Sequence, residues 1–419
     1  MSLGRNRVKI VPSVGESDAL RFHSRRVASW SVELAERAGL SLHSRSILWE
    51  AALQHHVPPL LVNEGGRARL LGDLGIAESD VAEGAALDSE VRQVLAAFHR
   101  RSEQPVSPDI EQLASILEEA NILDEAFETD SWNPGEFEHD PWVREILGKL
   151  RILPDNAGHY VMQHLPLLPP AAMDLIRKLY SDAVPAAELS RIIQSDPAEA
   201  AFLVRAANSG SNRPPAPAET VEHAITHLGF ETARKIVLAA SLRPLFDRQD
   251  LRGLWNHSLD AAQIADQLAT VADSNRRSEA FLAGLVHDVG RIIVLQLPAG
   301  FQIRYQRLIE QGCPMHETET VLAGFTHADC GAAVLESWQF PPAIARAVLH
   351  HHRLSDPSSL LAALLYLAEF WCAEEEDLPS SIRLHAALSA CGLDKSTLLG
   401  TEVHIGAPLE VLRFESRSE

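Results

Sequence analysis

Imidazole and carboxylate side chains recur through the second half of the chain, and their chemistry suits a metal site. The candidates are His257, His287, Asp288, His327, His351, His352 and Glu369. Histidine nitrogens and carboxylate oxygens are ligands that bind iron, manganese, zinc or magnesium in proteins. We therefore predict a divalent-metal site if the fold brings these side chains together.

The candidates fall on helix faces that are otherwise apolar. His257 shares a predicted helical face with Leu254 and Ala261, and Glu369 lies four residues after Leu365. A buried carboxylate is costly unless it is neutral, hydrogen-bonded or bound to a cation. Several inward-facing polar groups in one helical bundle can satisfy one another through a shared ion.

A structural interpretation stays open for each histidine. A single histidine is more often a hydrogen-bonded core or surface residue than a ligand, and the run at 350–352 could be a solvated helix end. The adjacent pair His287–Asp288 is harder to explain in that way, because the glycine that follows lets the chain turn while both side chains reach one ion. His223 and His227 are spaced to bind metal, but no carboxylate pattern accompanies them, and we interpret them as structural.

The elements that must position these groups are predicted to be helices, because strand-like alternation is scarce. Asp196 can cap a helix whose first turn holds Pro197, and Gly210 lies just beyond its expected end. Apolar residues at helical spacing predict further helices over 26–38, 110–127, 142–150, 173–180, 219–228 and 343–350. The predicted fold class is all-α.

Length and composition favour a globular protein that stays in the cytoplasm. The 419 residues are 46% hydrophobic, which is enough for a sizeable core and more than one domain. The formal net charge of -20 repels phosphate backbones and disfavours a nucleic-acid partner. Residues 1–18 lack the apolar core of a signal peptide, and the apolar stretch 360–373 is too short to span a bilayer. The four cysteines form no CxxC pair and indicate a reducing compartment.

Several segments resemble a known family in order along the chain. They are HLPLLPP at 164–170, IIQSDPAEAAFLVRAANSG at 192–210, the stretch 219–246, LWNHS at 254–258, FLAGLVHDVGR at 281–291, HADCGAAVLESW at 327–338 and HHH at 350–352. They are similar to HDOD domains, a branch of the HD superfamily of metal-dependent phosphohydrolases. The resemblance implies an all-α bundle and a role in bacterial signal transduction, and it leaves catalysis undecided.

The resemblance also assigns roles to residues. His257, His287 and Asp288 match the first three metal ligands of the superfamily, and His287 and Asp288 would be catalytic if the protein is active. His327, His351 and His352 match the additional histidines of the HD-GYP branch. Glu369 stands where the family usually has aspartate, and Arg291 stands where lysine often follows the HDxG turn. The GYP tripeptide is absent, which weakens a prediction of cyclic-dinucleotide hydrolysis.

The first part of the chain resembles the same superfamily more faintly. His23 stands at the first ligand position, His55–His56 replaces the HD pair, His99 lies near a later histidine, and Asn121 replaces an aspartate. The loss of both carboxylates removes most of the charge that holds a divalent metal. This part is either a degenerate HD-like domain without catalysis or an unrelated helical domain with scattered histidines.

Two functions remain open at this point. The first is a non-catalytic signalling protein that acts on a protein partner, with or without a bound metal, and that could form a homodimer. The second is a metal-dependent phosphohydrolase or phosphodiesterase. The expected organisation is an N-terminal tail at 1–19, a helical domain at 20–130, a linker with a short helix at 131–160, an HDOD domain at 161–400 and a C-terminal tail at 401–419.

Overall fold

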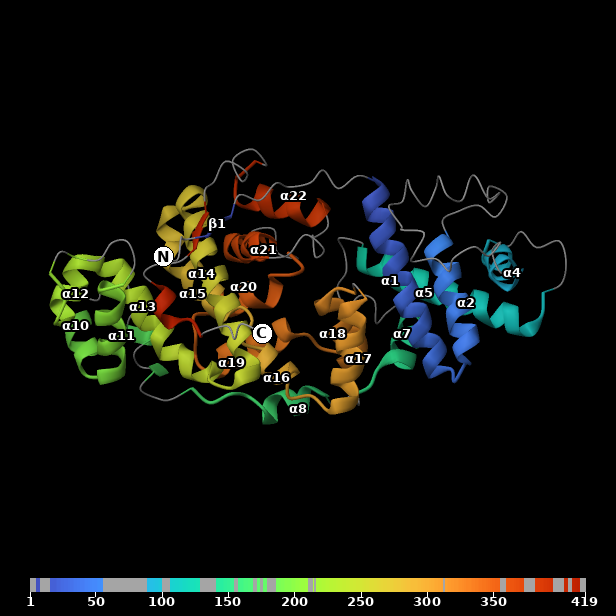
Figure 1. Ribbon diagram of the computed structural model, residues 1–419, viewed down its shortest axis with the longest axis horizontal. Coiled ribbons are helices and arrows are strands. Elements are labelled where there is room, and N and C mark those ends of the chain that lie inside the picture. The colour runs from blue at the N-terminus through green and yellow to red at the C-terminus, as the bar shows by residue number, and fades with distance from the viewer. Residues whose placement is uncertain are drawn as a thin grey trace. The chain divides into compact units, whose positions relative to one another are not determined.

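The protein is described by a computed structural model, shown as a ribbon in Figure 1. The residues that the structure describes are 5–7, 16–55, 89–99, 106–128, 141–153, 157–168, 172–173, 176–178, 186–209, 214, 216–311, 313–354, 359–372, 381–394, 403–405 and 409–414.

The chain folds into two compact units that alternate along the sequence. The major unit comprises Met1–Val11, Gly158–Gln296 and His327–Glu419, and the minor unit comprises Pro12–Ala157 and Leu297–Thr326. The chain thus leaves the major unit after residue 296 and returns to it at residue 327. Each unit is described separately below.

The major unit is built from helices and one small pair of strands. Its α-helices are α8 Ala157–Gln163, α10 Ala186–Gln194, α11 Pro197–Ala207, α12 Val221–Leu228, α13 Phe230–Leu242, α14 Arg252–Ala272, α15 Arg277–Val286, α16 Arg291–Val294, α19 His327–Ser337, α20 Pro342–His350, α21 Leu360–Cys372 and α22 Ser381–Ala390. The 3-10 turns are η3 Arg243–Phe246, η4 Gln249–Leu251, η5 Ser274–Arg276 and η7 Leu409–Leu412. Strands β1 Arg5–Arg7 and β2 Val403–Ile405 pair antiparallel, with Arg5 opposite Ile405.

The minor unit is helical throughout its described residues. Its helices are α1 Glu16–Arg37, α2 Leu42–Gln54, α4 Ser89–Phe98, α5 Pro108–Glu128, α7 Pro141–Leu150, α17 Ala299–Glu310 and α18 Met315–Ala323. The predicted all-α class is therefore confirmed, and the three-residue strands are its one departure among the described residues.

Most of the predicted helices are present. The segments 110–127, 142–150, 219–228 and 343–350 coincide closely with α5, α7, α12 and α20, whereas α1 begins ten residues before the predicted segment 26–38. Asp196 caps α11 as predicted, accepting hydrogen bonds from the backbone N–H groups of Ala198 and Glu199. The segment 173–180 and Gly210 lie largely or wholly outside the described residues.

The core of the major unit forms where α14, α15, α20 and α21 pack together. Trp255, Phe281 and Trp371 are at most 1% exposed there, and burying such a side chain contributes roughly 1.5–3 kcal/mol or more. Gly284 allows α14 and α15 to approach closely, because a Cβ atom at this position would lie 2.6 Å from the Cα of Ala262.

A second close approach joins α16 to α19. A Cβ atom on Gly290 would lie 1.9 Å from the carbonyl oxygen of His327 and 2.4 Å from the backbone nitrogen of Gly331. Only glycine fits at this position, so the HDVG turn and the start of α19 can meet. The two glycines therefore determine how near the histidines on these helices come to one another.

The minor unit repeats a packing pattern of the major unit. In the minor unit α1 packs on α2 and α5, and α4 packs on α2 and α5. In the major unit α14 packs on α15 and α21, and α20 packs on the same two helices.

The described residues include no helix that is long and apolar enough to cross a membrane.

Helices α17 and α18 belong to the minor unit through charge and apolar packing. Glu33 of α1 is fully buried and forms ion pairs with Arg304 and Arg307 of α17, while Glu36 of α1 pairs with Arg307 at 2.8 Å. Leu322 of α18 accepts a backbone hydrogen bond from Ile152 at 2.8 Å.

Candidate metal centre

The predicted ligands of the major unit converge at the ends of α14, α15, α19, α20 and α21. Three overlapping groups have ligand atoms within 4.8 Å of one another among the described residues. They are His257–His287–Glu369, His287–Asp288–His351 and His327–His351–His352. Every predicted metal ligand belongs to at least one group.

The first group surrounds the carboxylate of Glu369. Oε1 of this residue lies 2.9 Å from Nε2 of His257 and 2.9 Å from Nε2 of His287. Two ligands bound at about 2.1 Å to one ion lie at most about 4.2 Å apart, so these distances fit one cation. The longer side chain of glutamate, relative to the usual aspartate, therefore reaches the centre.

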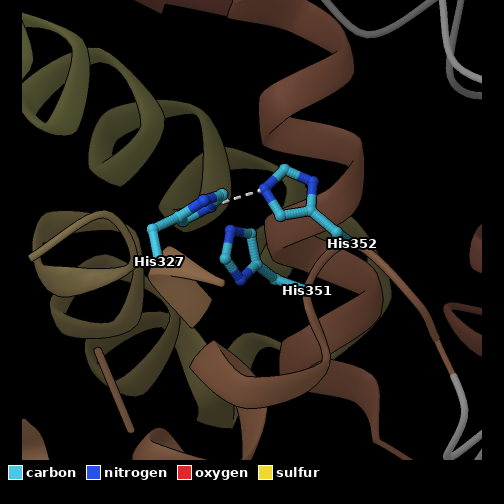
Figure 2. A group of neighbouring side chains, drawn as sticks. All are labelled: His327, His351 and His352. Carbon is cyan, nitrogen blue, oxygen red and sulfur yellow. Dashed lines mark hydrogen bonds between the residues drawn. The ribbon is translucent and has the colours of Figure 1, made fainter. Parts of the chain in front are cut away.

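The group His327–His351–His352 consists of three histidines, and Figure 2 shows their rings turned toward one another. Nε2 of His327 lies 2.9 Å from Nε2 of His352, the contact drawn as a dashed line. The ring centroids of His327 and His351 are 5.5 Å apart, and those of His351 and His352 are 4.0 Å apart. Three imidazoles thus present nitrogen atoms to one small volume.

Asp288 lies between the group around Glu369 and the three histidines His327, His351 and His352. Its Oδ2 lies 3.7 Å from Nε2 of both His257 and His287, and its Oδ1 lies 3.5 Å from Nε2 of His327. Arg291, three residues later, donates to Oδ2 at 2.9 Å. Asp288 would therefore be one of the residues that hold a cation at this centre.

Backbone carbonyls orient two of the rings. Nδ1 of His287 donates to the carbonyl oxygen of Gly284 at 2.7 Å, and Nδ1 of His351 donates to that of Val348 at 2.5 Å. Each ring therefore presents the Nε2 lone pair to the centre, which is the arrangement typical of metal-bound histidine. Both Nε2 atoms are buried and lack a hydrogen-bond partner, as does Oε1 of Glu369.

The electrostatics of the centre favour a positive species within it. Burial alone would lower the pKa of His257, but Glu369 and Asp288 raise it to about 9. Burial opposes the same change at His287, whose pKa Asp288 and Glu369 also raise. Burial lowers the pKa of His351 to about 3 with help from His287, so His351 is neutral and can donate a lone pair. Two carboxylates balance one divalent cation, and the donor set therefore fits such an ion.

One side of the centre is open to solvent. The side chains of His257, Glu369 and Arg291 are 28%, 24% and 27% exposed, whereas those of Asp288 and His327 are 4% and 1% exposed. Arg291 therefore lies at the partly exposed edge of the centre, beside Asp288.

Two candidate histidines lie apart from the centre, and two glycines that matter for packing were not predicted. His223 and His227 lie on α12, which contributes no residue to the three groups. Gly284 and Gly290 were not recognised as packing residues, although a glycine beside a predicted ligand could have suggested a close helix approach.

The minor unit holds a second buried polar centre, at His23 of α1, His55 after α2 and Asn121 of α5. Nε2 of His23 lies 3.3 Å from Nε2 of His55, and Oδ1 of Asn121 lies 3.2 Å and 3.0 Å from these two atoms. His99 lies after α4, and its ring stacks edge-on against Phe98. His56 lies outside the described residues.

The charge of this second centre is balanced within the protein. Nδ1 of His23 donates to Asp124 at 2.7 Å, and Arg26 donates to both carboxylate oxygens of Asp124 at 2.8 Å. Burial would raise the pKa of Asp124, but Arg26 and His23 hold it below its ordinary value. Arg26 and Asp124 were not predicted; each lies three residues from a predicted candidate, on the same helix face.

Comparisons with known proteins agree with the sequence resemblance. Residues 165–354 match the family model described as the HDOD domain. An uncharacterized protein of Treponema pallidum (strain Nichols) is 21% identical over 194 residues, which cover 45% of this chain and 38% of that relative. The chain thus spans well under half the length of this curated relative.

One of the two solved structures compared below shares the fold with a TM-score above 0.5. A proposed signal transduction protein of Marinobacter aquaeolei VT8 matches with a TM-score of 0.51 at 20% identity, covering 67% of this chain and 68% of that one. A proposed phosphohydrolase of Shewanella amazonensis SB2B matches with a TM-score of 0.48 at 24% identity, covering 58% of this chain and 92% of that one.

Proposed function

We propose that this chain, whose residues 165–354 form an HDOD domain, is a bacterial signal-transduction protein with a divalent-metal centre. It would act through contacts with a protein partner rather than by turnover. The observation that carries the proposal is the convergence of His257, His287, Asp288 and Glu369 with three further histidines at one buried point.

The metal part of the proposal follows from the orientation of His287. Its Nδ1–H donates to a backbone carbonyl, so its Nε2 lone pair faces the carboxylates of Glu369 at 2.9 Å and Asp288 at 3.7 Å. Lone pairs at such distances repel unless a proton or a cation lies between them. A centre with more imidazole than carboxylate ligands favours iron, manganese or zinc over magnesium, which prefers oxygen.

The regulatory part rests on how many elements the centre joins. Its ligands come from α14, α19 and α21 and from the residues that directly follow α15 and α20. An ion held by all of them would fix the mutual arrangement of these helices, and their outer faces could then bind a partner. The fold is shared with a proposed signal transduction protein, and the sequence lacks the GYP tripeptide.

Phosphoester hydrolysis is the second candidate, and the partial exposure of Arg291, His257 and Glu369 favours it. A bound metal would supply activated water and neutralise phosphate charge. Arg291 is 27% exposed beside Asp288, where its guanidinium could bind a phosphate oxygen. Asp288 and His287 would remain the residues nearest the reaction.

Metal analysis of the full-length protein separates these proposals. Iron, manganese and zinc would be measured by mass spectrometry after anaerobic purification, followed by assays with a generic phosphodiester and with cyclic dinucleotides. Stoichiometric metal without turnover supports the regulatory function, whereas turnover that is lost in Asp288→Ala supports hydrolysis. Absence of metal under every loading condition contradicts the metal centre. His223→Ala serves as the control, since His223 lies outside the three groups.

The protein partner and a homodimer remain proposals with their own test. Analytical ultracentrifugation of the metal-loaded and chelated protein would show whether the ion controls self-association. A mass that is the same in both states would contradict control of self-association by the centre.

A further inference from the structure

Residues 409–414 form a short segment, here called the strap, that lies against α11, α13 and α14 of the major unit. Leu409, Leu412 and Phe414 are 6%, 0% and 8% exposed. The strap is thus packed as core, although it is far in sequence from the helices that it contacts.

The helices recognise the backbone of the strap. Nε1 of Trp255 and Nε of Arg243 both donate to the carbonyl oxygen of Leu412, each at 2.9 Å. Asn256 makes two bonds to Phe414, donating to its carbonyl oxygen at 3.0 Å and accepting from its N–H at 3.0 Å. Paired bonds of this kind fix both the register and the direction of the strap.

Side chains of the strap add further contacts with the same helices. The guanidinium of Arg243 lies 3.9 Å from the ring centroid of Phe414, and that of Arg252 lies 5.1 Å from it. Arg413 forms an ion pair with Asp260. Cation–π attraction of this kind strengthens as the guanidinium and the ring lose contact with water.

These contacts surround one candidate ligand. Trp255 and Asn256 directly precede His257 on α14, and Asp260 lies one turn later. The first turn of α14 has no side-chain cap, and the side chain of His257 is 28% exposed, more than that of Glu369 or Asp288. The strap adds lateral contacts to this uncapped first turn, beside the ring of Phe246, which lies 5.2 Å from that of Trp255.

We propose that the strap positions His257 for the metal centre by holding the first turn of α14. The proposal rests on the metal centre proposed above, and it adds a dependence of that centre on residues 409–414. Trp255, Asn256 and Phe414 are positioning residues, since they act through the helix and lie outside the ligand groups.

Phe414→Ala in the full-length chain tests this directly. The variant removes the ring that packs against Arg243 while all metal ligands remain. We expect cobalt affinity to fall about tenfold, as for loss of other groups that orient metal ligands. The visible spectrum of the cobalt-loaded variant should shift toward that of His257→Ala. Amide hydrogen exchange should accelerate in 252–260 and stay unchanged in α15 and α21.

Two matched variants control for a general loss of stability. Phe414→Tyr keeps the ring and should retain the spectrum of the unmodified protein. Glu410→Ala removes a half-exposed side chain whose ion pair, with Arg413 at 3.1 Å, stays within the strap, and it should also have little effect.

A double substitution tests the link to His257 itself. Phe414→Ala should weaken cobalt binding no further in a His257→Ala background, because the positioned ligand is already gone. In a Glu369→Ala background the two effects should add. Additive losses in both backgrounds would overturn the proposal.

The outcomes separate the strap from the metal centre. If the unmodified protein takes up no metal, the proposed function fails, and the strap is judged on exchange in 252–260 alone. If metal binds and Phe414→Ala leaves both the spectrum and the exchange unchanged, the strap proposal fails and the metal centre stands. Faster exchange throughout the major unit would also contradict it.

Discussion

The two buried polar centres of this protein use similar helices but balance charge in opposite ways. In the minor unit Asp124 is paired with Arg26, and the histidines His23 and His55 meet a neutral amide. In the major unit Asp288 and Glu369 face imidazoles whose lone pairs point inward. In the minor unit the guanidinium of Arg26 donates to both oxygens of Asp124, whereas in the major unit Arg291 donates to Oδ2 of Asp288 and Glu369 faces two imidazole nitrogens at 2.9 Å.

The comparison shows that the two centres differ more in the charges around them than in their imidazoles. Buried imidazoles occur in both units, and Nδ1 of His55 donates to the carbonyl of Ala52 at 2.6 Å much as His287 donates to that of Gly284. The neighbouring charges differ. Five substitutions or treatments can break or sharpen this contrast.

The largest expected effect is on metal content. Asp288→Ala removes the carboxylate that lies between both ligand groups, and we expect it to abolish stoichiometric metal, measured by mass spectrometry. Asn121→Ala in the minor unit should leave the metal content unchanged. Equal losses in the two variants would contradict the assignment of the ion to the major unit.

The next effect is on stability. Asp124→Ala leaves Arg26 largely buried without its partner, and breaking a buried ion pair typically costs about 3–5 kcal/mol. Chemical denaturation should show this loss in the free energy of unfolding, with metal content unaffected. A loss below 1 kcal/mol would mean that the pair is worth no more than a surface ion pair.

The acid stability of the minor unit follows from the same pair. Because the folded pKa of Asp124 lies below its ordinary value of 3.8, the stabilisation is fully present above that value and is lost as pH falls through the folded pKa. Denaturation of the protein and of Asp124→Ala between pH 5 and pH 2 should give free energies that converge toward the acid end. A constant difference across this range would contradict the pairing.

Chelation should have a smaller and more local effect. An ion present at about 100 times its dissociation constant stabilises the folded state by about 2.7 kcal/mol. Its removal should lower the thermal transition of the major unit, and exchange in α1 and α5 should stay the same. Loss of protection in those helices on chelation would place an ion in the minor unit as well.

The smallest expected effect is a gain in metal affinity. Asn121→Asp adds a carboxylate beside His23 and His55, and we expect cobalt affinity at the minor centre to rise about tenfold, or ~1.4 kcal/mol. The measurement needs an Asp288→Ala background so that the major centre is silent. Asn121→Leu is the control, and equal affinities in both variants would refute the role given to charge.

The sequence predicted most of the helices, and it singled out the side chains that converge in the major unit, because both depend on local spacing. Metal binding by these side chains stays a prediction. Placing His257 and Glu369 on inward faces requires only helical periodicity, and adjacency suffices for His287 and Asp288. The resemblance to HDOD domains ordered these segments, and the matched family model supports it over 165–354.

Local spacing does not predict which residues far apart in the sequence will pair. Asp124 lies 98 residues from Arg26, and nothing in either helix indicates which partner neutralises it. The contacts of the strap with Trp255 and Asn256 likewise join segments more than 150 residues apart. Periodicity shows which face of a helix is buried, but not which other segment covers it.

The excursion of residues 297–326 into the minor unit has a practical consequence for dissecting the protein. A fragment that began at residue 158 would carry α17 and α18 without Glu33 and Glu36, leaving the arginines Arg304 and Arg307 without their buried counter-charges. Phe301 and Val321, both fully buried in the intact chain, would face solvent and invite aggregation. Biochemical work on the major unit therefore needs either the whole polypeptide or a short linker in place of these two helices.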